Sequence, residues 1–140
     1  MDKKMKECMK KSPFFLTDQK IEWVEQVLAS LSVEEKVGQL FCVNFRQGED
    51  EEIEYVYNIL SPGGCMYRTI PLERAVSFTN KVQSISKIPL LVAANLEKGG
   101  NGIVNEGTLF ASPMEVAATE NVEMAKHLAE ICAEEGKAVG

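Results

Sequence analysis

The sequence is poor in the residues from which metal centres are most often built. It has a single histidine, His127, among 140 residues. A site made of several histidines, or a mechanism that needs two of them, is therefore excluded within one chain. The four cysteines, at positions 8, 42, 65 and 132, have no C-x-x-C spacing, which excludes a zinc ribbon or a thioredoxin motif. We expect no bound metal. We interpret the cysteines as reduced, buried thiols, with a disulfide or a catalytic thiol as the alternative.

Long apolar runs and an excess of positive charge are also missing. No apolar segment approaches the roughly 20 residues that cross a bilayer, and no apolar core of a signal peptide follows the lysine-rich N-terminus. Fifteen basic against twenty-one acidic residues give a net charge of -6. Such a chain offers no global positive field to nucleic acid or to an anionic membrane surface. We expect a cytoplasmic protein with no nucleic-acid partner and no membrane partner.

What is present is the composition of an ordinary globular domain, with 45% hydrophobic and 26% charged residues. A chain of 140 residues is long enough for one domain with a core but hardly for two. We expect residues 1–16 to form an N-terminal tail, because the first twelve residues hold five lysines and should be solvated and poorly ordered. We expect residues 17–140 to form the folded part.

Helical and strand-like segments alternate over that part. Helical spacing of apolar residues recurs over residues 17–31, 49–60, 71–85 and 119–138, and Ser32 with Glu35 forms a capping box. Apolar runs at residues 40–45 and 90–94 predict buried strands, the first buried on both faces, and residues 65–67 predict a short strand. This order is typical of parallel βα units. We therefore predict an α/β fold in which about three strands form the first part of a (β/α)₈ TIM barrel, because a complete one takes about 250 residues.

Four stretches also resemble parts of a known barrel family. Residues 31–41 are similar to its opening helix and the entry to its first strand, 62–67 to its second strand, 88–93 to its third, and 112–119 to the segment before the next helix. In this order and spacing, they resemble the N-terminal domain of glycoside hydrolase family 3, nearest its bacterial β-N-acetylhexosaminidase-like members. The resemblance implies hydrolysis of terminal β-linked sugars, of the β-N-acetylglucosaminide or β-glucoside class, by a retaining mechanism without metal or cofactor.

The same resemblance implies where the catalytic groups lie. Family members take a carboxylate nucleophile from a late strand, and the hexosaminidase-like group uses a histidine-containing loop as acid/base. Both positions fall beyond residue 140. We therefore expect no catalytic residue in this chain, an inactive isolated chain, and a carbohydrate substrate for the full-length parent. His127 falls in the middle of a helix and is expected on its surface.

Candidate substrate-binding residues follow the strands, because functional residues of a barrel lie at the carboxyl ends of its strands. Arg68 follows the second strand, Asn95 and Glu97 follow the third, and Asn44 and Arg46 follow the first. The family usually has an Asp-x-Glu-Gly-Gly loop after its third strand, whose aspartate holds sugar hydroxyls. Asn95 stands at the position of that aspartate, and its amide can still donate and accept hydrogen bonds. Each candidate could instead cap its own loop or form a surface ion pair.

Other interpretations stay open. The chain could be a non-catalytic half-barrel that self-associates, a sugar-binding module, or a small doubly wound domain of the flavodoxin or receiver kind. Residues 99–102 could be mistaken for a phosphate-binding loop, but they lack the G-x-G-x-x-G and Walker spacings. A partial parallel sheet leaves an unpaired edge strand and an apolar face. We therefore expect the isolated chain to self-associate whether or not it derives from an enzyme.

Overall fold

A computed structural model describes residues 1–45 and 49–140, and Arg46, one of the candidates after the first strand, lies outside the described residues. The contacts divide the chain into two compact units, Met1–Val37 and Gly38–Gly140. The boundary expected between residues 16 and 17 falls inside the first unit. The two units are described separately below.

The first unit is helical. It contains α1 (Lys3–Met9), α2 (Asp18–Ser30) and most of α3 (Val33–Gly38). Thr17 caps α2, because its hydroxyl accepts a hydrogen bond from the Lys20 amide at 3.4 Å. The predicted capping box of α3 is confirmed, since the Ser32 amide donates to Glu35 at 2.7 Å and the Glu35 amide donates to the Ser32 hydroxyl at 3.1 Å.

The poorly ordered segment expected over residues 1–12 is instead largely helical. The Asp2 carboxylate accepts a hydrogen bond from the Met5 amide at 2.7 Å and so caps α1. Lys6 lies 2.6 Å from Glu25, and Lys10 lies 2.6 Å from Asp18. The physical reason for the difference is that two of the lysines pair with carboxylates of α2, which the local run of positive charge does not reveal.

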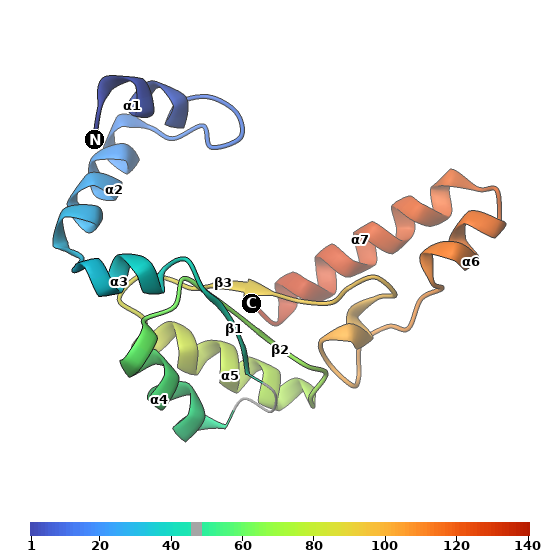
Figure 1. Cartoon of the computed structure of the whole chain (residues 1–140). Helices are drawn as coiled ribbons and strands as arrows, with labels where there is room; N and C mark the ends of the chain where they lie inside the picture. Colours follow the sequence, from blue (N-terminus) through green and yellow to red (C-terminus); the bar gives the residue numbers. More distant parts are fainter. Residues whose placement is uncertain (46–48) are drawn as a thin grey trace. The chain divides into compact units, whose positions relative to one another are not determined.

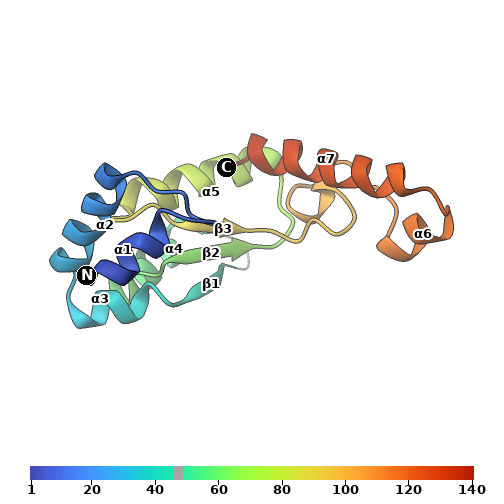
Figure 2. The ribbon, with the colours of Figure 1, turned by 90° about the horizontal axis from the view of Figure 1, so that it is seen from above.

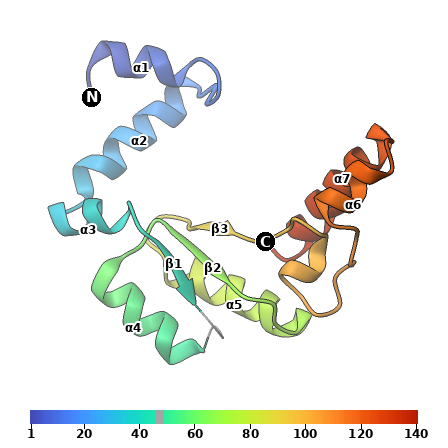
Figure 3. The same ribbon diagram turned by 45° about the vertical axis from the view of Figure 1, so that its right-hand side comes forward.

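The second unit is built from parallel βα units. In chain order it has β1 (Cys42–Phe45), α4 (Asp50–Leu60), β2 (Gly64–Tyr67), α5 (Leu72–Ile85), β3 (Leu91–Ala93), the 3-10 turn η1 (Gly100–Gly102), α6 (Pro113–Ala118) and α7 (Val122–Ala138) (Figure 1). The sheet has the order β1-β2-β3, and both strand pairs are parallel (Figure 3). The predicted α/β fold with three parallel strands is confirmed.

One face of the sheet packs against α4 and α5. Phe45, Cys65 and Tyr67 of the sheet and Phe78 of α5 are all buried in one cluster, which also contains Ile53 of α4. The Phe78 ring centroid lies 5.7 Å from that of Phe45 and 4.8 Å from that of Tyr67. Such aromatic pairs stabilise a core by about 0.5–1.5 kcal/mol beyond the area they bury. Phe78 therefore fixes the position of α5 on the sheet.

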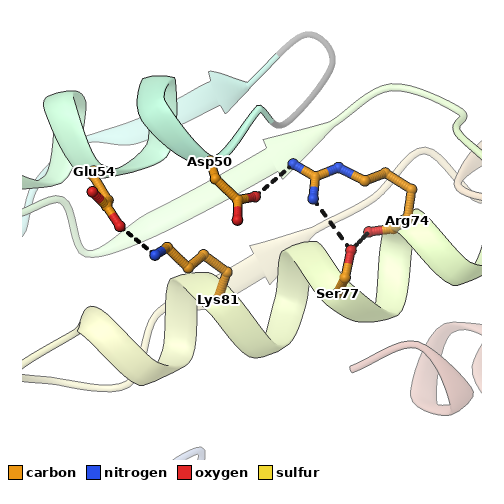
Figure 4. Close-up of polar contacts among 5 residues, drawn as sticks. All are labelled: Asp50, Glu54, Arg74, Ser77 and Lys81. Carbon is orange, nitrogen blue, oxygen red and sulfur yellow. Dashed lines mark hydrogen bonds and ion pairs between the residues drawn. The ribbon is translucent and has the colours of Figure 1, made fainter.

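Ion pairs join the exposed surfaces of α4 and α5. Arg74 lies 2.9 Å from Asp50 and also donates a hydrogen bond to Ser77 at 3.2 Å, while Lys81 pairs with Glu54 (Figure 4). Exposed pairs of this kind contribute about 0–1 kcal/mol each. The apolar cluster, rather than these pairs, therefore holds the two helices in place.

The opposite face of the sheet is exposed. Cys42, Asn44 and Ala93 are exposed on it, and Leu91 is 79% exposed. The prediction that residues 40–45 are buried on both faces is therefore wrong. The buried strand predicted over residues 90–94 is likewise exposed on this face, at Leu91 and Ala93. Helices α4 and α5 cover only one face, so alternate strand residues are left in solvent. For the same reason Cys42 is not a buried thiol, and Cys8, on α1, is exposed as well.

The remaining helices follow β3. Ser112 and Glu115 form a capping box that begins α6, and Asn121 caps α7. Helix α6 and the first half of α7 project beyond the sheet of this unit (Figure 2). Within residues 1–45 and 49–140, no helix has the length and apolar character needed to cross a membrane.

Candidate functional site

The carboxyl ends of the three strands lie at one edge of the sheet, as parallel pairing requires. Asn44 is opposite Met66 in the register, Arg68 follows β2, and Asn95 and Glu97 follow β3. Arg68, Asn95 and Glu97 are all exposed. Over the part of the chain that the structure describes, no hydrogen bond or ion pair joins these three side chains. The structure therefore places the predicted residues at the same edge without bringing them into contact.

Asn95 and Glu97 begin a compact loop, which we call the β3 loop (residues 95–108). A Cβ atom added to Gly102 would lie 1.5 Å from the Asn95 carbonyl oxygen, so only glycine allows this close approach of backbone to backbone. The Gly99 amide donates to the Leu96 carbonyl, and the Asn101 amide donates to the Thr108 carbonyl, both at 3.3 Å. The backbone that carries the two candidate residues is thus folded back on itself.

The β3 loop is also hydrogen-bonded to the segment that follows Arg68. The Ile70 amide donates to the Ile103 carbonyl at 3.3 Å, and the Asn105 amide donates to the Ile70 carbonyl at 3.0 Å. The Thr69 hydroxyl donates to the Asn101 carbonyl at 3.1 Å. The loops after β2 and β3 therefore form one connected structure, which limits the movement of their candidate residues relative to each other.

The titratable groups beneath this edge are neutral. Burial, with a smaller effect of nearby Cys42, raises the pKa of the Cys65 thiol from 9.0 to about 11, and burial also raises the pKa of Tyr67. Neither group is ionised at neutral pH, and the thiolate rather than the thiol is the nucleophile. Cys65 and Tyr67 are therefore parts of the core, and a ligand at this edge would meet the exposed residues instead.

The exposed residues supply groups suited to binding polar ligands. They offer the amide of Asn95, the guanidinium of Arg68 and the carboxylate of Glu97, which together can donate to and accept from hydroxyls. His127 is exposed on α7. In residues 1–45 and 49–140, no three histidine, cysteine, aspartate or glutamate side chains gather to hold a metal ion. The three exposed side chains thus offer both hydrogen-bond donors and acceptors at this edge of the sheet.

Sequence reasoning missed the residues that hold the β3 loop from its other side. Cys132 and Glu135 of α7 contact the loop near its two ends, at Leu96 and at Thr108. The only signal in the sequence was that Cys132 lies on the apolar side of its helix. Nothing in the local pattern distinguishes Glu135 from its neighbour Glu134, because the loop that it contacts lies far away in the chain.

Most of the chain is similar to known proteins. The profile of the family described as "Glycosyl hydrolase family 3 N terminal domain" matches residues 32–140. A protein from Cellulomonas fimi named "Beta-N-acetylglucosaminidase/beta-glucosidase" is 36% identical to the chain over 129 residues. That match covers 92% of this chain and 23% of the Cellulomonas protein.

Two solved structures are similar in both sequence and fold. One is titled "Beta-glucoside phosphorylase BglX bound to 2FGlc" and matches with 45% identity and a TM-score of 0.87. The other is titled "Beta-glucoside phosphorylase BglX" and matches with 45% identity and a TM-score of 0.84. Each match covers 94% of this chain, and 24% or 23% of the solved chain. The chain thus spans only about a quarter of the length of the relatives that it matches.

Proposed function

The chain belongs to the glycosyl hydrolase family 3 N-terminal domain family, and from this membership we propose that it is the N-terminal part of an enzyme that cleaves terminal β-linked sugars. The proposed substrates are β-glucosides and β-N-acetylglucosaminides. The observation that carries the proposal is the family match over residues 32–140, and the names of the similar proteins support it. The three βα units are the first part of the (β/α)₈ barrel of these enzymes.

In this proposal the chain supplies binding groups, and the rest of the parent supplies the catalytic ones. The Asn95 amide donates to and accepts from the hydroxyls of the sugar. Arg68 and Glu97 contact its other polar groups from the neighbouring loops. Retaining cleavage needs a nucleophile and an acid/base on opposite sides of the glycosidic bond, about 5–5.5 Å apart when both are carboxyl groups. The candidate residues include only one carboxylate, so the isolated chain is expected to be inactive.

A second candidate activity differs only in the molecule that accepts the sugar. The titles of the two solved structures name phosphorylases, and this observation favours phosphorolysis. In hydrolysis, water accepts the glycosyl group and a free sugar leaves. In phosphorolysis, inorganic phosphate accepts it and a glycosyl phosphate leaves. The two activities share the same glycosidic bond and the same binding groups for the sugar.

The test is an assay of the longer enzyme that contains this chain. Its substrates are p-nitrophenyl β-glucoside and p-nitrophenyl β-N-acetylglucosaminide, each with and without inorganic phosphate. Nitrophenol release supports the proposal. A free sugar as the other product identifies a hydrolase, and a glycosyl phosphate identifies a phosphorylase. Failure to cleave either substrate would overturn the proposed function.

The isolated 140-residue chain is the matched control for this assay. We expect it to release no nitrophenol above the buffer rate, because the proposed catalytic groups lie outside it. Activity that stays with the isolated chain through every purification step would show that the catalytic groups lie within this chain.

A further inference from the structure

Helix α7 contacts the first part of the β3 loop through Cys132. The Cys132 thiol donates a hydrogen bond to the Leu96 carbonyl, with sulfur and oxygen 2.8 Å apart. Leu96 lies between Asn95 and Glu97, the two candidate residues of this loop. A contact at the Leu96 carbonyl therefore orients the peptide unit that directly precedes Glu97, one residue after Asn95.

The same helix contacts the end of the loop through Glu135. The Thr108 amide lies 3.0 Å from one Glu135 carboxylate oxygen and 3.2 Å from the other, and the Thr108 hydroxyl donates to the carboxylate as well. Hydrogen bonds to an ionised acceptor are roughly twice as strong as those between neutral groups. Glu135 therefore fixes both the backbone and the side chain of Thr108.

The shape of the loop is matched to this carboxylate. A Cβ atom added to Gly100 would lie 1.8 Å from a Glu135 carboxylate oxygen, so the Glu135 side chain lies directly on the loop backbone. Glu135 is half-buried, whereas Glu134, the preceding residue, is exposed. The Glu135 side chain thus fills the space beside Gly100 that a larger residue at that position would occupy.

We propose that Cys132 and Glu135 are positioning residues that hold the β3 loop so that Asn95 and Glu97 meet the sugar. The proposal rests on the proposed function. Contacts with Ile70 and Thr69 fix one side of the loop, and the two α7 side chains fix the other. A displaced binding group makes weaker contacts with its ligand, so the conformation of the loop sets how well its side chains bind. The two side chains act through the loop and do not themselves touch the sugar.

The first experiment measures amide hydrogen exchange in the 140-residue chain. Glu135→Ala and Cys132→Ala should each speed exchange of the loop amides, such as those of Asn101 and Thr108, by about tenfold or more, since local opening exposes them. Amides of α4 and α5 should be unaffected and so report that the chain is folded. Glu134→Ala is the matched control on the same helix and should leave the loop amides unchanged.

Conservative variants sharpen this experiment. Cys132→Ser keeps a donor for the Leu96 carbonyl, and Glu135→Gln keeps an acceptor for the Thr108 amide, so both should retain slow exchange. Loop amides that exchange at the unsubstituted rate in Glu135→Ala and Cys132→Ala would overturn the proposal. Faster exchange in Glu134→Ala to the same extent would also overturn it, because the effect would then belong to the helix as a whole.

The second experiment measures kinetics in the longer enzyme with p-nitrophenyl β-glucoside. Both alanine variants should raise KM about tenfold or more with kcat retained, because displaced binding groups weaken substrate binding. Simple loss of folded enzyme would instead lower kcat and leave KM unchanged. Cys132→Ser should restore KM. A KM unchanged in both alanine variants would overturn the positioning role.

The two experiments separate this proposal from the proposed function. If the unsubstituted enzyme cleaves no β-linked sugar, the proposed function fails and the sugar-positioning role fails with it. The exchange measurement still decides whether Cys132 and Glu135 hold the loop. If the enzyme is active but the loop exchanges equally in all variants, the proposed function stands and only the positioning role is overturned.

Discussion

Under the proposed function, Asn95 is the residue of the β3 loop that we expect to contact the sugar through its amide. It is exposed, it lies beyond the carboxyl end of β3, and its backbone carbonyl packs against Gly102. Its amide can form neutral hydrogen bonds with a hydroxyl, whereas a carboxylate at the same position would form stronger charge-assisted bonds. The side chain at position 95 should therefore influence sugar affinity directly.

Substitution of Asn95 in the longer enzyme tests this role. Asn95→Ala should raise KM for p-nitrophenyl β-glucoside by about tenfold, which corresponds to the loss of roughly 1.4 kcal/mol, a typical value for one hydrogen bond to the ligand. Asn95→Asp should bind the sugar at least as tightly as the unsubstituted enzyme. Asn58→Ala, at an exposed position of α4, is the control. An unchanged KM in Asn95→Ala would argue against contact between Asn95 and the sugar.

The buried Cys65 thiol links the stability of the chain to pH. Its side chain is fully buried, and burial raises the pKa of its thiol from 9.0 to about 11. A raised pKa in the folded state means that the unfolded chain loses this proton first as the pH increases. The thiol thus favours the folded state below pH 9, and this contribution is lost as the pH rises from about 9 to about 11.

Unfolding in urea at several pH values tests this linkage. The free energy of unfolding should fall between about pH 9 and pH 11. The fall should be smaller in Cys65→Ala, and the remainder includes Tyr67, whose pKa burial also raises. Cys8→Ala, which removes an exposed thiol of α1, is the control. An equal fall in Cys65→Ala and in the unsubstituted chain would contradict the linkage.

At the scale of the element, α5 shows how helix packing positions the loops at the carboxyl ends of the strands, where the candidate residues lie. Its buried side chains include Ala75, Phe78 and Val82, spaced for one helical face, and that face lies on the sheet. The segment between β2 and α5 then pairs with the β3 loop through Ile70. The position of α5 therefore determines where the loop after β2, and with it Arg68, meets the loop after β3.

Removal of the central side chain of this face tests its importance. Phe78→Ala should lower the free energy of unfolding by about 3–5 kcal/mol, because it leaves a cavity between Phe45 and Tyr67. Val76→Ala, at a position of α5 that is 39% exposed, should change it by at most about 0.5 kcal/mol. Urea unfolding followed by circular dichroism measures both. Similar losses for the two variants would show that the core is not centred on Phe78.

Local patterns predicted most elements because the information in them is local. The capping box at Ser32 and the helices over residues 50–60 and 72–85 follow from spacing and from side chains a few residues apart. The same patterns failed for α1, whose lysines pair with a distant helix. They also placed Asn95 and Glu97 after β3 but could not identify Glu135, because its partner Thr108 lies 27 residues away.

At the scale of the whole chain, one face of the sheet in the second unit is left exposed. Leu91 is 79% exposed and Leu40 is 85% exposed, and a hollow of about 360 Å³ lies over this region. It is lined by Gln39, Leu40, Phe41, Cys42, Gly63, Gly64, Leu91, Val92 and Ala93. Within the described sheet, β1 and β3 are edge strands. Exposed apolar surface and unpaired strand edges both favour association.

We therefore expect the isolated chain to form dimers or larger assemblies. Sedimentation velocity over a range of concentrations measures this directly. Leu91→Lys should shift the population towards monomer, because it places a charge on the exposed face beside the edge strand β3. Met114→Lys, at a position of α6 that is 83% exposed, is the matched control and should leave the association unchanged. A monomer at every concentration would refute the expectation.

The sequence by itself determined the order of helices and strands, the parallel βα organisation and the family resemblance, because periodicity, caps and motif order depend on neighbouring residues. Only the tertiary structure decided which face of β3 is covered, since its run Leu91-Val92-Ala93 is apolar on both faces. It also decided that α7 contacts the β3 loop, because Cys132 and Glu135 gain their roles from Leu96 and Thr108. Contacts between segments far apart in the chain have no local signature, and folding alone brings them together.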